Sequence, residues 1–299
     1  MTILRVVRVA VIGAGLMGAQ IGCEYALGGH DVVLQARNVG ATRARVEAAF
    51  ALLSAHGLRT HAEVAEAARR VSTVGRPTDA ADGAEIVVES LPEDIELKVS
   101  VLQTACAVAP GAIVATNTSS LSISTIGEAI GRPERTVGTH YLNPPLLMPP
   151  VEVVAGERTS PETVEFVRTV LVELGKLPIV VRRDVPGFVW NRLQFALVRE
   201  CVWLVENGVA TAEDVDTVMR EGLARRWGRV GPLRSIALGG VDTWNRSGRN
   251  IVPELSNASQ LPELSGIAIM GGDLAAGAAA RDAGLASDLR DDTKTGGSS

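Results

Sequence analysis

The sequence has few cysteines, and none of them is placed for a disulfide or a metal site. Its three cysteines, Cys23, Cys106 and Cys201, are far apart, and no pair has the spacing of a disulfide framework or of a CxxC metal site. These features argue against a small stapled fold and against a cysteine-held metal. They favour a protein of the reducing cytoplasm.

The chain also lacks a surplus of positive charge. It has 29 Lys and Arg residues against 34 Asp and Glu residues, a formal net charge of -5 and a sequence pI near 5.5. Proteins that bind nucleic acid or anionic membranes need excess basic residues to neutralise phosphates. We therefore expect neither nucleic acid nor a membrane surface as a partner.

Long apolar runs are missing as well. The longest uncharged stretch, 99–127, is interrupted by Gln103, Pro110-Gly111 and a polar Asn-Thr-Ser-Ser cluster, whereas a membrane-spanning helix needs about 18 or more consecutive apolar residues. Glycines also cut the apolar run at the N-terminus, so we expect no signal peptide and a cytoplasmic location.

What the chain does contain is ample apolar material. It has 299 residues, of which 46% are hydrophobic and 21% charged, and its mean hydropathy is +0.19. This composition lies far from that of disordered chains. Since domains average roughly 150 residues, two domains are the starting expectation.

A glycine-rich turn is the first motif along the chain. Gly13-Ala14-Gly15-Leu16-Met17-Gly18 follows an apolar strand candidate, 6–12, and opens a helical segment, 19–27, before a second strand, 31–35. In this βαβ context Gly13 permits the tight turn, Gly15 lets the backbone approach a pyrophosphate, and Gly18 lets helix and strand pack. The helix N-terminus, including Leu16 and Met17, offers N–H groups to the anion. The alternative is a turn that serves packing alone.

The pattern of strands and helices continues to about residue 182 and then changes. Strand candidates at 86–88, 113–115, 137–142, 151–154 and 178–181 alternate with helical patterns such as 41–53 and 93–107. Beyond them, helical segments at 188–206, 212–223 and 232–244 have no strand between them. We predict an α/β, doubly wound Rossmann-type sheet in residues 1–182, followed by a smaller all-α domain in 183–299 with a frayed tail from Arg290.

His140 is the histidine best placed for chemistry. It ends a strand candidate, and in open α/β sheets ligands are handled at the carboxyl ends of strands. Glu152 lies at the start of the next strand candidate. A carboxylate that binds a histidine fixes its tautomer and stabilises the imidazolium, which suits proton transfer. On spacing alone, an ordinary loop histidine remains the better interpretation.

A set of motifs in register resembles the 3-hydroxyacyl-CoA dehydrogenase family. The motifs are Gly13 to Gly18, Val87-Val88-Glu89-Ser90-Leu91-Pro92-Glu93, Asn117-Thr118-Ser119-Ser120-Leu121, His140-Tyr141-Leu142-Asn143-Pro144 with Val151-Glu152-Val153-Val154, and Asp184 to Leu193 with its Pro-Gly-Phe. The resemblance covers about residues 6 to 245. It implies hydride transfer between C3 of an acyl substrate and a nicotinamide coenzyme.

The same resemblance implies roles for individual residues. His140 and Glu152 become the proton-transfer pair, while Ser119 and Asn191 contact the substrate oxygen. Glu93, Lys98 and Asn117 are assigned to the coenzyme, and no metal is expected. Because Ser119 and Asn191 come from distant segments, we expect the cleft between the domains to bring them together near His140. The resemblance also implies a homodimer formed through the helical domain.

The residues at the end of the second strand indicate which coenzyme the chain prefers. NAD-binding units of this type place an acidic residue there, about 20 residues beyond the glycines, to bind the adenosine ribose. This chain has Ala36 at that position, with Arg37 beside it. No carboxylate would repel a 2′-phosphate, and a guanidinium could bind one. NAD or NADP is expected, with NADP modestly favoured; Arg37 could instead stack on adenine or point to solvent.

The substrate is less clearly indicated. Around Gly222 to Trp227 the chain resembles the branch with L-gulonate dehydrogenase, lambda-crystallin and carnitine dehydrogenase more than the fatty-acid oxidation enzymes. Arg225 and Arg226 could bind a substrate carboxylate, or lie on a solvated helix end. We expect a small-molecule or carrier-bound acyl substrate. The alternatives are a ketoreductase of polyketide biosynthesis and a non-catalytic, crystallin-like dinucleotide-binding protein.

Overall fold

The structure is a computed structural model that describes residues 6–262 and 274–295. The chain forms two compact units: unit 1 comprises Met1–Trp190 with Ala275–Ser299, and unit 2 comprises Asn191–Leu274. The division falls at Trp190, later than the predicted boundary at 182, because the intervening segment remains hydrogen-bonded to unit 1. Asp184 accepts hydrogen bonds from Ser122, and the Trp190 N–H donates to Glu152.

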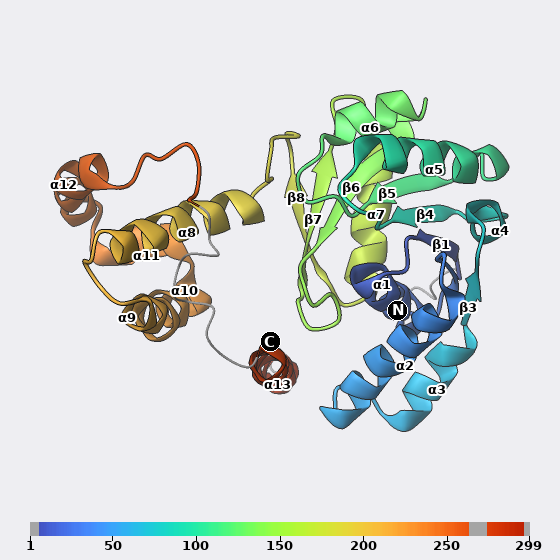
Figure 1. The fold of residues 1–299 in the computed structure, drawn as a ribbon, viewed down its shortest axis with the longest axis horizontal. Coiled ribbons are helices and arrows are strands. Elements are labelled where there is room, and N and C mark those ends of the chain that lie inside the picture. Colours follow the sequence, from blue (N-terminus) through green and yellow to red (C-terminus); the bar gives the residue numbers. More distant parts are fainter. Residues whose placement is uncertain (1–5, 263–273, 296–299) are drawn as a thin grey trace. The chain divides into compact units, whose positions relative to one another are not determined.

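Unit 1 is built on one eight-stranded sheet with the order β3-β2-β1-β4-β5-β6-β7-β8 (Figure 1). The strands are β1 (Arg8–Ile12), β2 (Asp31–Gln35), β3 (Val71–Val74), β4 (Ile86–Glu89), β5 (Ile113–Thr116), β6 (Thr136–Tyr141), β7 (Pro150–Ala155) and β8 (Leu177–Val181). The first six are parallel, and β7 pairs antiparallel with β6. This is the predicted doubly wound sheet. The short strand β3 was not predicted.

Helices cover both faces of the sheet. They are α1 (Leu16–Leu27), α2 (Val39–Ala55), α3 (His61–Arg69), α4 (Pro77–Ala81), α5 (Ile95–Val108), α6 (Ile123–Ala129) and α7 (Pro161–Glu173). Residues of α1, α2, α3 and α7 share one core cluster with alternate strand residues such as Val9 and Val11. The other strand residues, such as Ala10 and Ile12, pack with α4, α5 and α6. Burial on both faces explains the continuous apolar strands.

Unit 2 is helical, as predicted. Its first helix is α8 (Trp190–Glu206), of which Trp190 still belongs to unit 1. The segments that follow are α9 (Ala212–Thr217), a π-helical segment (Val218–Ala224), α10 (Arg225–Val230), α11 (Pro232–Gly239) and α12 (Val241–Ile251). Gly231 and Gly240 have positive φ angles, 70° and 85°, at the joints that flank α11. Glycine adopts this conformation without a steric penalty, so the helical stretch breaks there.

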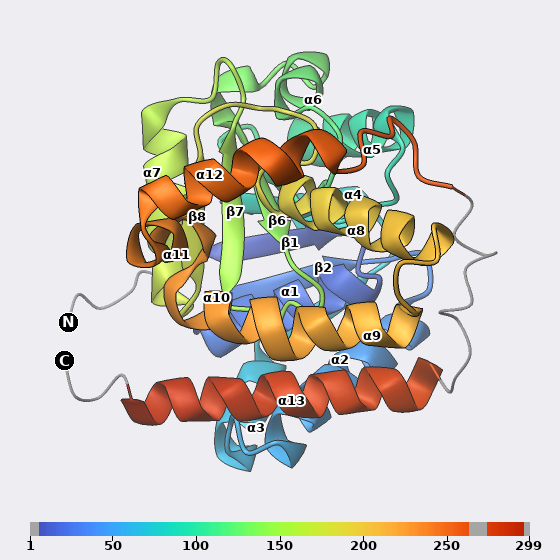
Figure 2. The ribbon, with the colours of Figure 1, turned by 90° about the vertical axis from the view of Figure 1, so that its left-hand side faces the viewer.

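In the described part of the tail, where we expected fraying from Arg290, α13 runs from Leu274 to Thr295 as one helix (Figure 2). Alanine, the best helix former, dominates its first half. Arg290 also donates a hydrogen bond to the His56 carbonyl, 2.8 Å away, at the end of α2. This contact holds the helix where composition alone indicated fraying. Within the described ranges, no helix is both long and apolar enough to cross a bilayer.

Candidate active site

The glycine turn between β1 and α1 is shaped for close approach of another molecule. Gly13 has a φ of +92°, and its N–H donates to the Gln35 carbonyl at 3.1 Å, which ties the turn to β2. A Cβ on Gly18 would collide with the Gly13 carbonyl, so that glycine serves packing. A Cβ on Gly15 would meet nothing within 4 Å. Gly15 therefore lies beside open space, which a pyrophosphate group fits at this helix N-terminus.

A cavity of about 570 Å³ extends from this turn along the ends of β1, β2 and β4. Its lining includes Gly13, Gly15, Gln35, Ala36, Arg37, Asn38, Arg45, Ser90, Leu91 and Leu97, and none of its lining residues is acidic. Arg37 and Arg45 are both exposed. The cavity thus combines the predicted coenzyme residues of the turn and of β2 with a second arginine that the sequence reasoning did not identify.

A buried charge network lies behind the cavity wall. The Lys98 ammonium is 2.7 Å from a Glu89 oxygen and 3.2 Å from Glu93, and it donates to the Leu91 carbonyl at 3.0 Å. Lys98 and Glu89 are 1% and 0% exposed. Lys98 therefore holds Glu89 and the Leu91 main chain in place. Because Leu91 lines the cavity, Lys98 contributes to the predicted coenzyme site indirectly, by positioning this loop.

Glu93 connects this network to Ser119. Its carboxylate accepts hydrogen bonds from the Thr118 and Ser119 hydroxyls, each at 2.9 Å. Burial acts to raise the pKa of Glu93, but the Ser119 N–H, the Lys98 charge and the two hydroxyls outweigh it and lower that pKa. Two residues with different predicted partners, coenzyme and substrate, thus lie in contact.

Asn117 links three neighbouring strand ends. Its side-chain amide donates to the Ser90 hydroxyl at 3.3 Å, and its carbonyl oxygen accepts the Tyr141 N–H at 2.9 Å. Ser90 follows β4, Asn117 follows β5 and Tyr141 ends β6. Asn117 therefore positions the end of β6, where His140 lies.

His140 and Glu152 form a direct pair across β6 and β7. The two residues are register partners in the antiparallel ladder, and His140 Nδ1 lies 2.6 Å from Glu152 Oε2. Both are buried, at 6% and 3% exposure. A hydrogen bond of this length at Nδ1 favours the tautomer that leaves Nε2 to exchange a proton.

The second oxygen of Glu152 is held by main-chain groups. Glu152 Oε1 accepts the N–H groups of Val189 and Trp190 at 2.8 and 2.9 Å. Burial acts to raise the pKa of the Glu152 carboxyl, but the hydrogen bonds from His140, Trp190 and Val189 outweigh it and lower that pKa. The carboxylate is therefore kept ionised beside the imidazole.

Other predicted residues lie elsewhere. Asn191 follows Trp190 directly and is the first residue of unit 2, so its convergence with Ser119 and His140 stays a prediction. Arg225 forms an exposed ion pair with Glu221 at 3.3 Å, and Arg226 is exposed, which agrees with a solvated helix end. Leu16 is 61% exposed at the start of α1, and Met17 is half-buried.

Besides Arg45, the sequence reasoning missed three further features of the site. Glu89 was part of a quoted motif but was given no role, although a charged residue in an apolar strand is a signal of a buried pair. The Phe188 ring stands edge-on to the His140 imidazole, with 5.7 Å between centroids. The Glu152 carboxylate is also bound by the N–H groups of Val189 and Trp190, and because these are main-chain groups, no residue type in the sequence indicates them.

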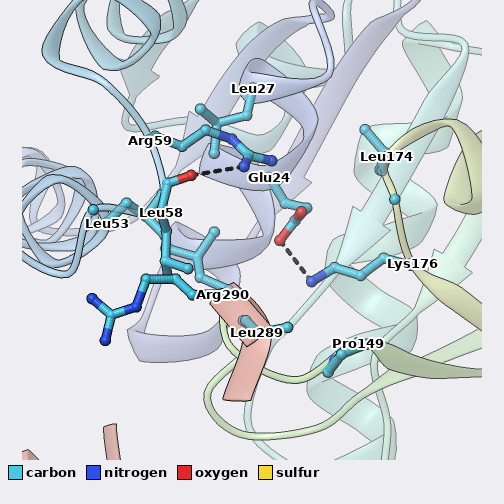
Figure 3. A pocket seen from close by; sticks show the side chains of 13 residues that line it. Glu24, Leu27, Leu53, Leu58, Arg59, Pro149, Leu174, Lys176, Leu289 and Arg290 are labelled. Atoms are coloured by element: carbon cyan, nitrogen blue, oxygen red, sulfur yellow. Dashed lines mark hydrogen bonds and ion pairs between the residues drawn. The ribbon is translucent and has the colours of Figure 1, made fainter. Parts of the chain in front are cut away.

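A second, smaller cavity of about 290 Å³ lies against α1, the end of α7 and α13 (Figure 3). The Glu24 and Lys176 side chains meet there at 2.8 Å, and the Lys176 ammonium also donates to the Pro145 carbonyl at 2.7 Å. This cavity contains none of the predicted site residues. Among the described residues, no group of His, Cys, Asp or Glu could hold a metal ion.

Comparison with protein-family models assigns both parts of the chain. Residues 8–185 match the model described as 3-hydroxyacyl-CoA dehydrogenase, NAD binding domain, and residues 187–261 match its C-terminal domain.

Curated proteins and solved structures agree with these matches. The chain is 36% identical over 254 residues to the 5-formyl-3-hydroxy-2-methylpyridine 4-carboxylate 5-dehydrogenase of Mesorhizobium japonicum, covering 84% of this chain and 81% of that protein. It is 35% identical to an L-carnitine dehydrogenase of a Pseudomonas species, with 85% and 78% covered. A crystal structure of the first enzyme type, described as an NAD⁺-dependent dismutase, aligns with a TM-score of 0.87 at 32% identity over 96% of this chain and 98% of that one. The (S)-3-hydroxybutyryl-CoA dehydrogenase of Ralstonia eutropha aligns with a TM-score of 0.68 at 32% identity, over 73% and 78%.

Proposed function

This chain belongs to the 3-hydroxyacyl-CoA dehydrogenase family of oxidoreductases, and from that membership we propose that it interconverts a hydroxy and a keto group on a 3-hydroxyacyl or hydroxy-acid substrate. The bound nicotinamide would supply or accept the hydride. The observation that carries the proposal is the 2.6 Å contact between His140 and Glu152 at the same sheet edge as the glycine turn.

The pair has the groups needed to move the substrate proton. In the reducing direction, a protonated His140 would donate from Nε2 to the oxygen that becomes the hydroxyl, and Glu152 would stabilise the imidazolium before the transfer. In the oxidising direction, the neutral imidazole would take the hydroxyl proton. Ser119, and Asn191 from unit 2, would hydrogen-bond the substrate oxygen as its charge changes.

Substitution of His140 tests this proposal directly. In His140→Gln we expect kcat to fall by about 10² to 10⁴-fold, the usual contribution of general acid-base catalysis. The dissociation constant for the coenzyme should stay within a few-fold of the parent value. The assay is nicotinamide absorbance with acetoacetyl-CoA, 3-dehydrocarnitine or a formylpyridine carboxylate as substrate. Parent-like turnover in the variant would contradict the role of His140.

The proposal extends to the coenzyme: the chain binds a nicotinamide dinucleotide and accepts the 2′-phosphate of NADP at Arg37. The supporting features are Ala36 in place of an acidic residue, two exposed arginines in the cavity lining, and no carboxylate in that lining. Gly15 lies beside open space, where the pyrophosphate that NAD and NADP share would lie, so this turn does not distinguish the two coenzymes. The ratio of kcat/KM for NADPH to that for NADH decides between them.

A second candidate substrate class has support of its own. The structure of the formylpyridine carboxylate dehydrogenase aligns over 98% of its length, against 78% for the hydroxybutyryl-CoA enzyme. A small carboxylate-bearing alcohol or aldehyde would then replace the acyl thioester, with the same proton transfer at His140. Comparing kcat/KM for acetoacetyl-CoA and for the formylpyridine carboxylate separates the two classes. A carrier-bound polyketide remains the substrate to test if both are refused.

Assembly and location complete the proposal. We assign a homodimer to this chain, with unit 2 at the interface, because large apolar side chains such as Leu233 and Leu238 are 80% and 70% exposed on α11. The cytoplasm is the proposed compartment, in keeping with cysteines that are all unpaired.

A further inference from the structure

The segment that joins β8 to α8 contacts both members of the His-Glu pair. After β8 ends at Val181, residues 184–190 run past β7 and α6 before α8 begins at Trp190. Within this joining segment, the Phe188 ring packs edge-on against His140, and the N–H groups of Val189 and Trp190 bind Glu152. The imidazole and the carboxylate are therefore both held by the same seven residues.

The start of the joining segment is anchored by Asp184. One oxygen of its carboxylate accepts three hydrogen bonds, from the Ser122 hydroxyl at 2.7 Å, the Ser124 N–H at 3.0 Å and the Ser124 hydroxyl at 3.1 Å. Ser122 is also the N-cap of α6. A carboxylate held by three donors has little freedom to move, so this end of the segment is fixed to α6.

The middle of the segment is strained. Phe188 has a φ of +49°, and it is the one described residue other than glycine with a positive φ. A bulky side chain in this region is a real outlier, and such residues cluster at functional sites. Phe188 is 1% exposed and packs with Ile123, Val154 and Val181, so the surrounding core keeps the ring against the imidazole.

We propose that Asp184 and Phe188 are positioning residues for the proposed proton transfer. Asp184 fixes the joining segment so that its N–H groups keep the Glu152 carboxylate in place, and Phe188 fixes the plane of the His140 ring. This inference rests on the proposed function of the pair. It assigns roles to two residues that make no contact with the reacting atoms and act through Glu152 and His140.

The test compares kcat, KM and the pH dependence of kcat for Asp184→Ala and Phe188→Leu in the keto-reducing direction. A misplacement of about 1 Å can cost about 10²-fold in rate, so we expect kcat to fall about 10- to 100-fold with the coenzyme dissociation constant unchanged. The groups facing Glu152 are the His140 imidazole and the two N–H groups. Loosening those N–H bonds in Asp184→Ala should raise the pKa at which the acidic limb of kcat falls.

Conservative and matched variants separate positioning from stability. Asp184→Asn keeps one acceptor oxygen and should recover most of kcat. Glu63→Ala is the control for Asp184, because Glu63 also accepts hydrogen bonds at a helix N-terminus, from Thr60. Phe50→Leu is the control for Phe188, since Phe50 is 4% exposed in the core of unit 1. Both controls should lower Tm without moving the acidic limb of the pH profile of kcat.

A spectroscopic reading makes the inference independent of turnover. The proton shared by His140 Nδ1 and Glu152 should give a downfield proton resonance that disappears in His140→Gln and shifts in Asp184→Ala and Phe188→Leu. The positioning roles would be overturned if folded Asp184→Ala and Phe188→Leu kept the kcat of the parent, its acidic limb in the pH profile of kcat and its downfield proton resonance. Parent-like turnover in His140→Gln would instead overturn the proposed function itself.

Discussion

At the scale of the residue, the two oxygens of the Glu152 carboxylate have different hydrogen-bond partners. One oxygen faces the His140 imidazole and the other faces two main-chain N–H groups. A carboxylate with both oxygens occupied is stabilised in its charged form, and the lowered pKa of Glu152 agrees with this. Its charge is then available to stabilise a protonated imidazole across the working pH range.

The first prediction follows from that charge. In Glu152→Gln the neutral amide keeps the size of the side chain but cannot stabilise an imidazolium, so kcat should fall, by about 10-fold or more. In the parent, Glu152 loses its charge only when the pH falls below its lowered pKa, so the acidic limb of kcat should lie below the usual range of a glutamate. That limb should be absent from Glu152→Gln. A pH profile of kcat from pH 3 to 9, which reaches below the usual glutamate range, measures both effects.

Arg37 carries the second prediction, which concerns the coenzyme. A charge-assisted contact with a phosphate is worth about 1.5 to 3 kcal/mol, which corresponds to about 10- to 150-fold in kcat/KM. Arg37→Ala should therefore lose that factor with NADPH and change little with NADH, and Arg45→Ala should lose part of it. Arg43→Ala is the control, because Arg43 lies on α2 with Arg45 but donates a hydrogen bond to Thr73. An unchanged NADPH/NADH ratio in Arg37→Ala would exclude a phosphate contact.

At the scale of the element, the β1–α1 turn separates packing from binding. A Cβ on Gly13 would lie 2.6 Å from the Ser90 carbonyl oxygen, at a φ that favours glycine, whereas a Cβ on Gly15 would meet open space. We predict that Gly13→Ala lowers Tm, with or without coenzyme. Gly15→Ala should leave Tm of the free protein nearly unchanged but weaken coenzyme binding by 10-fold or more, because the methyl group would occupy the pyrophosphate position.

Two measurements check this pair of variants. Thermal unfolding of the free protein measures the loss of Tm that comes from packing, and fluorescence titration with NADH measures the dissociation constant of the coenzyme. Equal loss of Tm in the two variants, with equal coenzyme affinity, would show that neither glycine faces a bound molecule.

The elements that the sequence predicted well are those whose signals are local. Strands β1, β2 and β4 each carry three or four consecutive buried apolar residues, and the buried polar residues Gln35 and Glu89 stand only at the carboxyl ends of β2 and β4. The glycine turn stands directly between β1 and α1, so pattern and motif agree. Strand β3 was missed because Val71–Val74 is short and only partly buried, which leaves it without an apolar pattern. The helix at the tail was missed because its stabilising contact, from Arg290 to the His56 carbonyl, joins residues distant in sequence.

The site shows the same limit. His140 and Glu152 could be named from motifs, but their contact depends on an antiparallel register that only the folded sheet provides. The main-chain donors at Val189 and Trp190 have no side-chain signature at all. Arg45 was missed because α2 places it on the cavity two turns beyond the position where a coenzyme residue is usually sought.

At the scale of the whole molecule, the chain passes from unit 1 to unit 2 directly beside the His-Glu pair. Trp190 closes unit 1 and Asn191 opens unit 2, and the Trp190 N–H binds Glu152. The proposed substrate residue Asn191 is thus one peptide bond from a group that holds the proton-transfer pair.

The last prediction concerns assembly. Exposed apolar patches on a soluble chain commonly mark interfaces, and α11 presents Leu233 and Leu238 at 80% and 70% exposure. We expect light scattering to give about twice the chain mass of 31.3 kDa. Leu233→Glu together with Leu238→Glu should shift the mass to that of the monomer, because two charges would be buried without partners at the interface. Leu177→Glu is the control, since Leu177 is 59% exposed on β8 of unit 1 and should leave the dimer intact. A monomeric parent, or a dimer that only Leu177→Glu dissociates, would contradict an interface on unit 2.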